Sequence, residues 1–207
     1  MNKKLAAALS GGAVLMLALT GCGDSGDNSA DKADAWAKKV CGQAQPQLQK
    51  IANANAAIQQ QTAENSKPAD VQAADSQAFQ QISEAYKALG DAVEAAGAPP
   101  AEDGDQTQQK AVKELDASAV AYAGLQKKVD ALDVKDQAKF ADGLKGVADE
   151  LEKISKSGDE ALRKLQSGEV GQAMAKQTGC QKPTPSAPPS AQPSSESPAS
   201  ASPSKKA

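Results

Sequence analysis

The chain has 207 residues, of which 40% are apolar, 24% are charged and only 2% are aromatic, and its formal charge at pH 7 is −3. It contains no histidine, which excludes zinc sites that need histidine, di-iron bundles and Ser/His/Asp or Cys/His nucleophile systems. Its basic side chains form no field interleaved with stacking aromatics, so we expect no nucleic-acid partner.

Residues 1–21 have the layout of a secretory signal peptide. Lys3 and Lys4 form a short positive segment, and an apolar stretch of 15 residues, 5–19, follows it. A membrane-spanning helix needs about 20 apolar residues, so this shorter stretch predicts a signal that is cleaved. Without Lys3 and Lys4, 21 of the 23 basic side chains remain against 26 acidic ones, a formal charge of −5 for the mature chain.

The end of this segment, Leu19-Thr20-Gly21-Cys22, resembles the lipobox of bacterial lipoproteins. The resemblance implies cleavage after Gly21 and a diacylglycerol on the sulfur of Cys22. Two acyl chains hold a protein stably on a membrane, whereas one chain binds reversibly. We therefore expect a lipid anchor on the extracytoplasmic face of the cell membrane, with residues 22–30 as a tether; ordinary secretion with an unmodified Cys22 is the alternative.

Residues 31–180 are predicted to form a helical domain. Apolar residues recur at steps of three and four, and no segment alternates as a strand would. The first helix is expected to begin near residues 29–31 and to run to about Ala63. Gly42 and Pro46 lie inside it, and a proline removes one helical hydrogen bond, so a kink or break is expected at residues 42–46.

Three further helical stretches follow. The second begins at Ser66-Lys67-Pro68 and ends before Gly97, the third runs from about Asp105 to Leu132, and the fourth runs from about Phe140 to Cys180, with Gly158 and Gly168 as candidate breaks. Short connections between long helices favour antiparallel neighbours. The sequence thus predicts an all-α fold, an antiparallel up-down-up-down four-helix bundle with a kinked first helix and a segmented last helix. Its alanine-rich stripes predict close helix packing with little room for an internal ligand, so no cofactor is expected.

The cysteine count bears on the same domain. If Cys22 is lipidated, Cys41 and Cys180 remain as an even pair in an oxidising compartment, where a disulfide is expected. The up-down topology would bring the start of the first helix and the end of the fourth to one pole. We therefore expect a Cys41–Cys180 disulfide that closes the bundle at its membrane-proximal pole.

One acidic segment has partial calcium-loop spacing. Asp103, Asp105, Thr107 and Glu114 fall at positions 1, 3, 5 and 12 of such a loop. Position 6 is Gln108, where the sharp turn of the loop needs glycine. We interpret the group instead as acidic residues favoured at a helix N-terminus by the helix dipole, and expect no bound metal.

Two other features admit a functional interpretation. Asp149, Glu150 and Glu152 could serve as the paired carboxylates of a glycosidase, but lysines at helical spacing, such as Lys153 after Glu150, are typical of an exposed helix face. Trp36 is either a core anchor near the disulfide or a ligand platform. We favour the core anchor.

From residue 181 to 207 the composition changes. Residues 183–207 contain 7 Pro and 8 Ser, which predicts a disordered, partly extended tail. A solubilising end is the simplest interpretation; reach into the cell wall, O-glycosylation or a weak grip on anionic polymers are alternatives.

Taken together, the lipobox, the segment Trp36-Ala37-Lys38-Lys39-Val40-Cys41, the late Gly179-Cys180 and the Pro/Ser tail resemble small secreted lipoproteins of actinobacteria. The resemblance implies an address and a disulfide but supplies no catalytic residue. We expect a non-enzymatic binding or scaffold module that contacts another envelope protein or a wall polymer. The alternatives are a carrier of a small apolar or lipidic ligand and, last, a carboxylate-dependent hydrolase.

Overall fold

The structure is a computed structural model of the chain, and it describes residues 25–61, 66–157 and 160–183. This part consists of six α-helices and one short 3-10 helix, with no β-strand among the described residues. The predicted all-α class is therefore confirmed. None of the helices within these ranges is long and apolar enough to span a bilayer. The predicted signal peptide (residues 1–21), with Leu19 to Gly21, the predicted lipidation site Cys22 and the predicted tail from residue 184 onward lie outside the described residues.

The first helix, α1 (Ser25–Gln60), begins earlier than the sequence indicated and ends close to the predicted Ala63. It begins inside the predicted tether, 22–30, and it continues through Pro46 without interruption, so the expected break is wrong. An interior proline costs about 3 kcal/mol of helix stability. Packing offsets this cost, because Trp36 and Val40 are buried before the proline and Ala54 is buried after it.

The next two helices agree with the sequence prediction. Helix α2 (Pro68–Ala96) has a proline in its first turn, which suits that position because the first N–H groups of a helix have no partner within it. It ends at Gly97, whose φ of +82° favours glycine. Helix α3 (Gly104–Asp130) begins at a glycine that lies against Pro99, in the segment that connects α2 to α3. A Cβ on Gly104 would lie 2.2 Å from the carbonyl oxygen of Pro99, so only glycine permits this approach.

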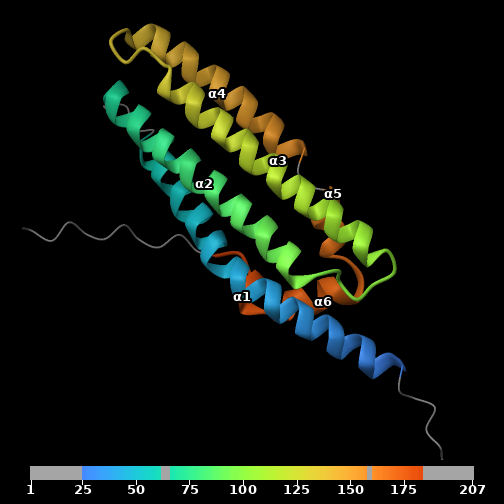
Figure 1. Ribbon diagram of the computed structural model, residues 1–207. Helices are drawn as coiled ribbons and strands as arrows, with labels where there is room; N and C mark the ends of the chain where they lie inside the picture. The colour runs from blue at the N-terminus through green and yellow to red at the C-terminus, as the bar shows by residue number, and fades with distance from the viewer. Residues whose placement is uncertain (1–24, 62–65, 158–159, 184–207) are drawn as a thin grey trace, which may run out of the picture.

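The predicted fourth helix consists of three pieces, α4 (Gln137–Ser157), α5 (Glu160–Leu165) and α6 (Gly168–Lys176), followed by the 3-10 helix η1 (Thr178–Cys180). Gly168 has a φ of +62° and starts α6, so the break expected there is confirmed; Gly158 lies outside the described residues. Helices α4 and α5 pack on α3, whereas α6 and η1 pack on α1 (Figure 1).

Two clusters of buried side chains hold the helices together. The first, called here the disulfide-end core, joins α1, α2, α3, α5 and α6 through residues that include Trp36, Val40, Val93, Leu115, Leu165 and Val170. The second, called here the far core, joins the four helices α1, α2, α3 and α4. Its residues include Ala54, Phe79, Ile82, Leu125, Val129 and Val147. Ten of the 23 buried apolar residues in the described part are alanines, as the stripes predicted. Tyr86 packs against both cores.

Candidate functional site

The predicted disulfide is present. The sulfur atoms of Cys41 and Cys180 are 1.98 Å apart and the two Cα atoms 4.9 Å apart. Cys41 is the seventeenth residue of the 36-residue α1, and Trp36, five residues before it, contacts Gly97 at the end of α2. The disulfide therefore lies near the end of the bundle at which α2 ends. Helix α6 and η1 pack on α1, which brings Cys180 next to Cys41.

Gly179 allows this close approach of η1 to α1. A Cβ at Gly179 would lie 2.3 Å from the carbonyl oxygen of Cys41, far inside van der Waals contact. The backbone of η1 therefore rests directly on the backbone of α1 next to the disulfide. This contact places η1 along the side of α1.

An apolar groove lies next to the disulfide. It encloses about 370 Å³, and its walls come from α1, α2, α3, α5 and α6, with Cys180 and Pro183 at one side. Most of its lining is aliphatic, and the lining side chains include Val40, Ala44, Leu48, Ile51, Leu89 and Met174. We call this feature the disulfide groove.

The groove is open to solvent, so it is not the internal ligand space that the close helix packing was expected to exclude. Leu48, Ile51 and Leu89 belong to the apolar stripes of α1 and α2, but they are only half-buried and they line the groove. Among the described residues, α4 ends at Ser157, and the groove is lined on this side by Leu165 of α5 and Met174 of α6 instead. The spacing of apolar residues predicted that these side chains lie on the inward faces of their helices. Their exposure in the groove depends on tertiary packing, because it follows from where α4 ends and α5 and α6 begin.

Two stacked tyrosine rings lie at the groove, and one of them forms part of its lining. Tyr86 lines it and stacks on Tyr122 of α3, with the ring centroids 5.4 Å apart and the planes 12° apart. Burial raises the pKa of Tyr122 to about 12, with a smaller contribution from Tyr86. The Tyr122 hydroxyl therefore stays protonated at neutral pH. Lys182 lines the groove and is exposed, so it supplies a cation near the opening.

Trp36 is a core anchor, as we favoured. Its side chain is 6% exposed within the disulfide-end core. The indole Nε1–H donates a hydrogen bond of 2.8 Å to the carbonyl oxygen of Gly97. Trp36 thus fastens α1 to the end of α2.

The calcium-like residues do not assemble into a site. Helix α3 begins at Gly104, Thr107 is buried, and Asp103 is at the N-cap position with a φ of 61° but makes no side-chain capping hydrogen bond. The Asp103 carboxylate lies 4.0 Å from Lys164 of α5. Within the described ranges, no group of three or more Cys, Asp or Glu residues is placed to hold a metal ion.

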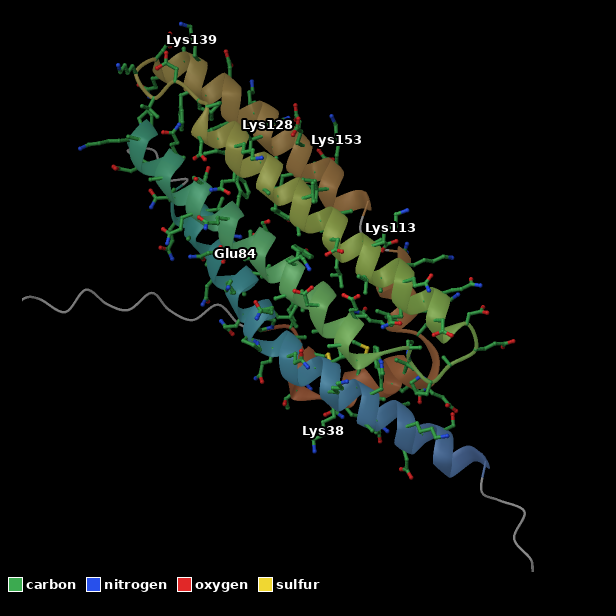
Figure 2. The ribbon with its side chains drawn as sticks, viewed as in Figure 1. Lys38, Glu84, Lys113, Lys128, Lys139 and Lys153 are labelled. Carbon is green, nitrogen blue, oxygen red and sulfur yellow. A yellow bond between two sulfur atoms is a disulfide. The ribbon has the colours of Figure 1, made fainter. Side chains whose placement is uncertain are left out.

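The carboxylates of α4 also stay apart from any cavity described above. Asp149 and Glu152 are exposed. Glu150 forms an ion pair with Lys128 of the neighbouring helix α3, a partner that the sequence spacing did not identify. Figure 2 labels Lys128 and Lys153 on these adjoining helices. This arrangement is typical of a solvent-exposed helix surface that carries ion pairs.

No protein-family model matches the sequence, and comparisons with curated proteins and with solved structures likewise find no match.

Proposed function

We propose that this protein is a lipid-anchored, non-enzymatic binding module on the extracytoplasmic side of the cell membrane. Its membrane contact would be the diacylglycerol on Cys22, as the resemblance of residues 19–22 to a lipobox implies. Of the two classes of partner expected from the sequence, an envelope macromolecule and a small apolar ligand, the disulfide groove favours the second. The proposed ligand is a single fatty acyl chain.

The shape and chemistry of the groove carry this proposal. Its volume of about 370 Å³ falls within the range of small-molecule sites, roughly 300 to 1,000 Å³. Each methylene moved from water into such a site contributes about 0.8 kcal/mol, so an acyl chain gains affinity from a lining without specific polar contacts. Lys182 at the groove is suited to pair with the carboxylate of a fatty acid.

The proposed position of the groove depends on the topology of the helices. We propose that α1 to α4 form an up-down-up-down bundle, with the groove on its side where α4 gives way to α5 and α6. The packing of α1 on α2, α2 on α3 and α3 on α4 supports this topology. So do the short connections between α2 and α3 and between α3 and α4.

The test compares two alanine-to-phenylalanine variants in binding a fluorescent fatty acid. Ala44 is 5% exposed and lines the groove, so Ala44→Phe should fill it and weaken binding at least tenfold. Ala148→Phe adds the same ring at an exposed position of α4 and should leave binding unchanged. Circular dichroism would verify that both variants are folded.

Equal binding by the two variants and the unmodified chain would refute the acyl-chain site. Native mass spectrometry of protein from its own membranes provides a second measurement. A bound acyl species beyond the anchor lipid is expected. Recovery of a reproducible envelope protein with no such species would favour the scaffold function instead.

A further inference from the structure

A second cavity lies at the other end of the described helices, next to the far core. It encloses about 250 Å³ and is formed where α1 ends and where α2 and α4 begin. Its lining combines apolar side chains, Ile58, Phe140 and Leu144, with the polar groups of Gln61, Gln137 and Asp75. We call it the Asp75 cavity.

Asp75 occupies a position where the helix pattern calls for an apolar residue. It follows Val71 by four residues and precedes Phe79 by four, on the inward face of α2. It is 7% exposed. Its Oδ1 atom is buried, and no hydrogen-bond donor among the described residues reaches it.

The protein's own cations leave this carboxyl group uncompensated. Burial alone raises the pKa of Asp75 to about 6, with no contribution from a neighbouring charge. Lys67 and Lys135 at the same end are exposed, and Lys139, labelled in Figure 2, lies 3.1 Å from the carboxylate of Asp136. A buried carboxylate without a paired charge is costly to keep in a folded protein.

We propose that the Asp75 cavity binds a small organic amine whose ammonium group pairs with the free Oδ1 of Asp75. The apolar part of the amine would lie against Ile58, Phe140 and Leu144. An N–H donor supplies the missing hydrogen bond, and its positive charge compensates the carboxylate through a charge-assisted hydrogen bond.

The cavity discriminates among cations. Calcium needs six to eight oxygen ligands and magnesium six, but Asp75 is not part of any three-residue acidic cluster in the described ranges. An alkyl or aryl ammonium ion needs only one carboxylate, and it gains from burying its apolar part. At about 30 Å³ for each water-sized group, 250 Å³ accommodates about eight such groups, which fits a compact amine.

The experiment uses the full chain with benzylamine as the probe and benzyl alcohol as its uncharged match. Benzylamine should bind saturably, measured by calorimetry and by the carbon shift of the Asp75 carboxyl group. Benzyl alcohol should bind at least tenfold more weakly. Asp75→Asn keeps the shape of the side chain and should weaken benzylamine binding at least tenfold, whereas Asp142→Asn changes an exposed carboxylate of α4 and should leave it unchanged.

A second variant tests the cavity without touching the carboxylate. Ala141 lines the cavity and is solvent-exposed. Ala141→Phe can therefore fill the cavity without disturbing the packing of α4. Benzylamine binding by this variant should be lost. Equal affinity for the amine and the alcohol, or undiminished amine binding by Asp75→Asn, would overturn the proposal. Absence of saturable binding to the folded, unmodified chain would overturn it as well.

Discussion

Replacing Asp75 with asparagine should make the unliganded protein more stable at neutral pH. The unfolded chain ionises Asp75 with a pKa near 3.8, whereas burial raises the pKa in the folded state to about 6. Between these values the folded state binds more protons than the unfolded state does. The free energy of unfolding of the wild type therefore falls as the pH rises through this window and levels off above it.

The size of the effect follows from the shift. One pKa unit corresponds to 1.36 kcal/mol, so the change from 3.8 to about 6 removes up to about 3 kcal/mol between pH 4 and neutrality. Asp75→Asn cannot ionise and escapes this loss. Its stability relative to the wild type should thus grow by up to about 3 kcal/mol over that interval, starting from a small difference at pH 4.

Urea unfolding followed by circular dichroism at pH 4, 5, 6 and 7, without added amines, measures this difference. Asp142→Asn serves as the control, because its carboxylate is exposed, and its stability should track the wild type at every pH. The reasoning is refuted if the difference between Asp75→Asn and the wild type does not change with pH. That outcome would mean that Asp75 has an ordinary pKa and a partner that satisfies it.

Four other variants have clear expected outcomes. Gly179→Ala should lower the free energy of urea unfolding by about 1 to 3 kcal/mol, because its Cβ would collide with the Cys41 carbonyl. Gly42→Ala has open space around its Cβ and should raise that free energy by up to about 1 kcal/mol; equal effects at the two glycines would contradict the η1 packing. Removing the disulfide by replacing Cys41 and Cys180 with alanine opens a loop spanning 139 positions and should cost up to about 5 kcal/mol, with no loss if the thiols are free. Cys22→Ala should shift the protein from membrane to medium in cell fractionation, and retention on the membrane would argue against the lipid anchor.

Helix positions could be predicted from the sequence because they depend on local signals. Pro68 and Gly97 mark the limits of α2, and the step pattern of apolar residues fixed the inward face of each helix. Pro46 is the counter-example, since a local rule predicted a break there and buried side chains on both sides keep the helix continuous. Tertiary packing outweighs a local penalty of about 3 kcal/mol when the helix is long enough to be held at both ends.

The sites were harder to predict than the helices. Cysteine parity identified the Cys41–Cys180 pair, but the sequence could not indicate that η1 would turn onto the middle of α1, because that turn depends on how Gly179 fits against α1. The disulfide groove likewise depends on where α4 ends and α5 and α6 begin. Asp75 did leave a local signal, an acidic residue within an apolar stripe, and a search for polar residues at core spacing would have found it.

The cost of Asp75 links stability to the proposed amine site. At neutral pH the residue destabilises the empty protein by up to about 3 kcal/mol, although an apolar side chain would fit the same stripe. Carboxyl groups held in such unfavourable surroundings concentrate at binding and catalytic sites. An amine present at a hundred times its dissociation constant stabilises the folded state by about 2.7 kcal/mol, which nearly cancels that cost. Benzylamine should therefore bring the wild type close to the stability that Asp75→Asn has without amine at pH 7, while it stabilises the variant by no more than about 1.4 kcal/mol.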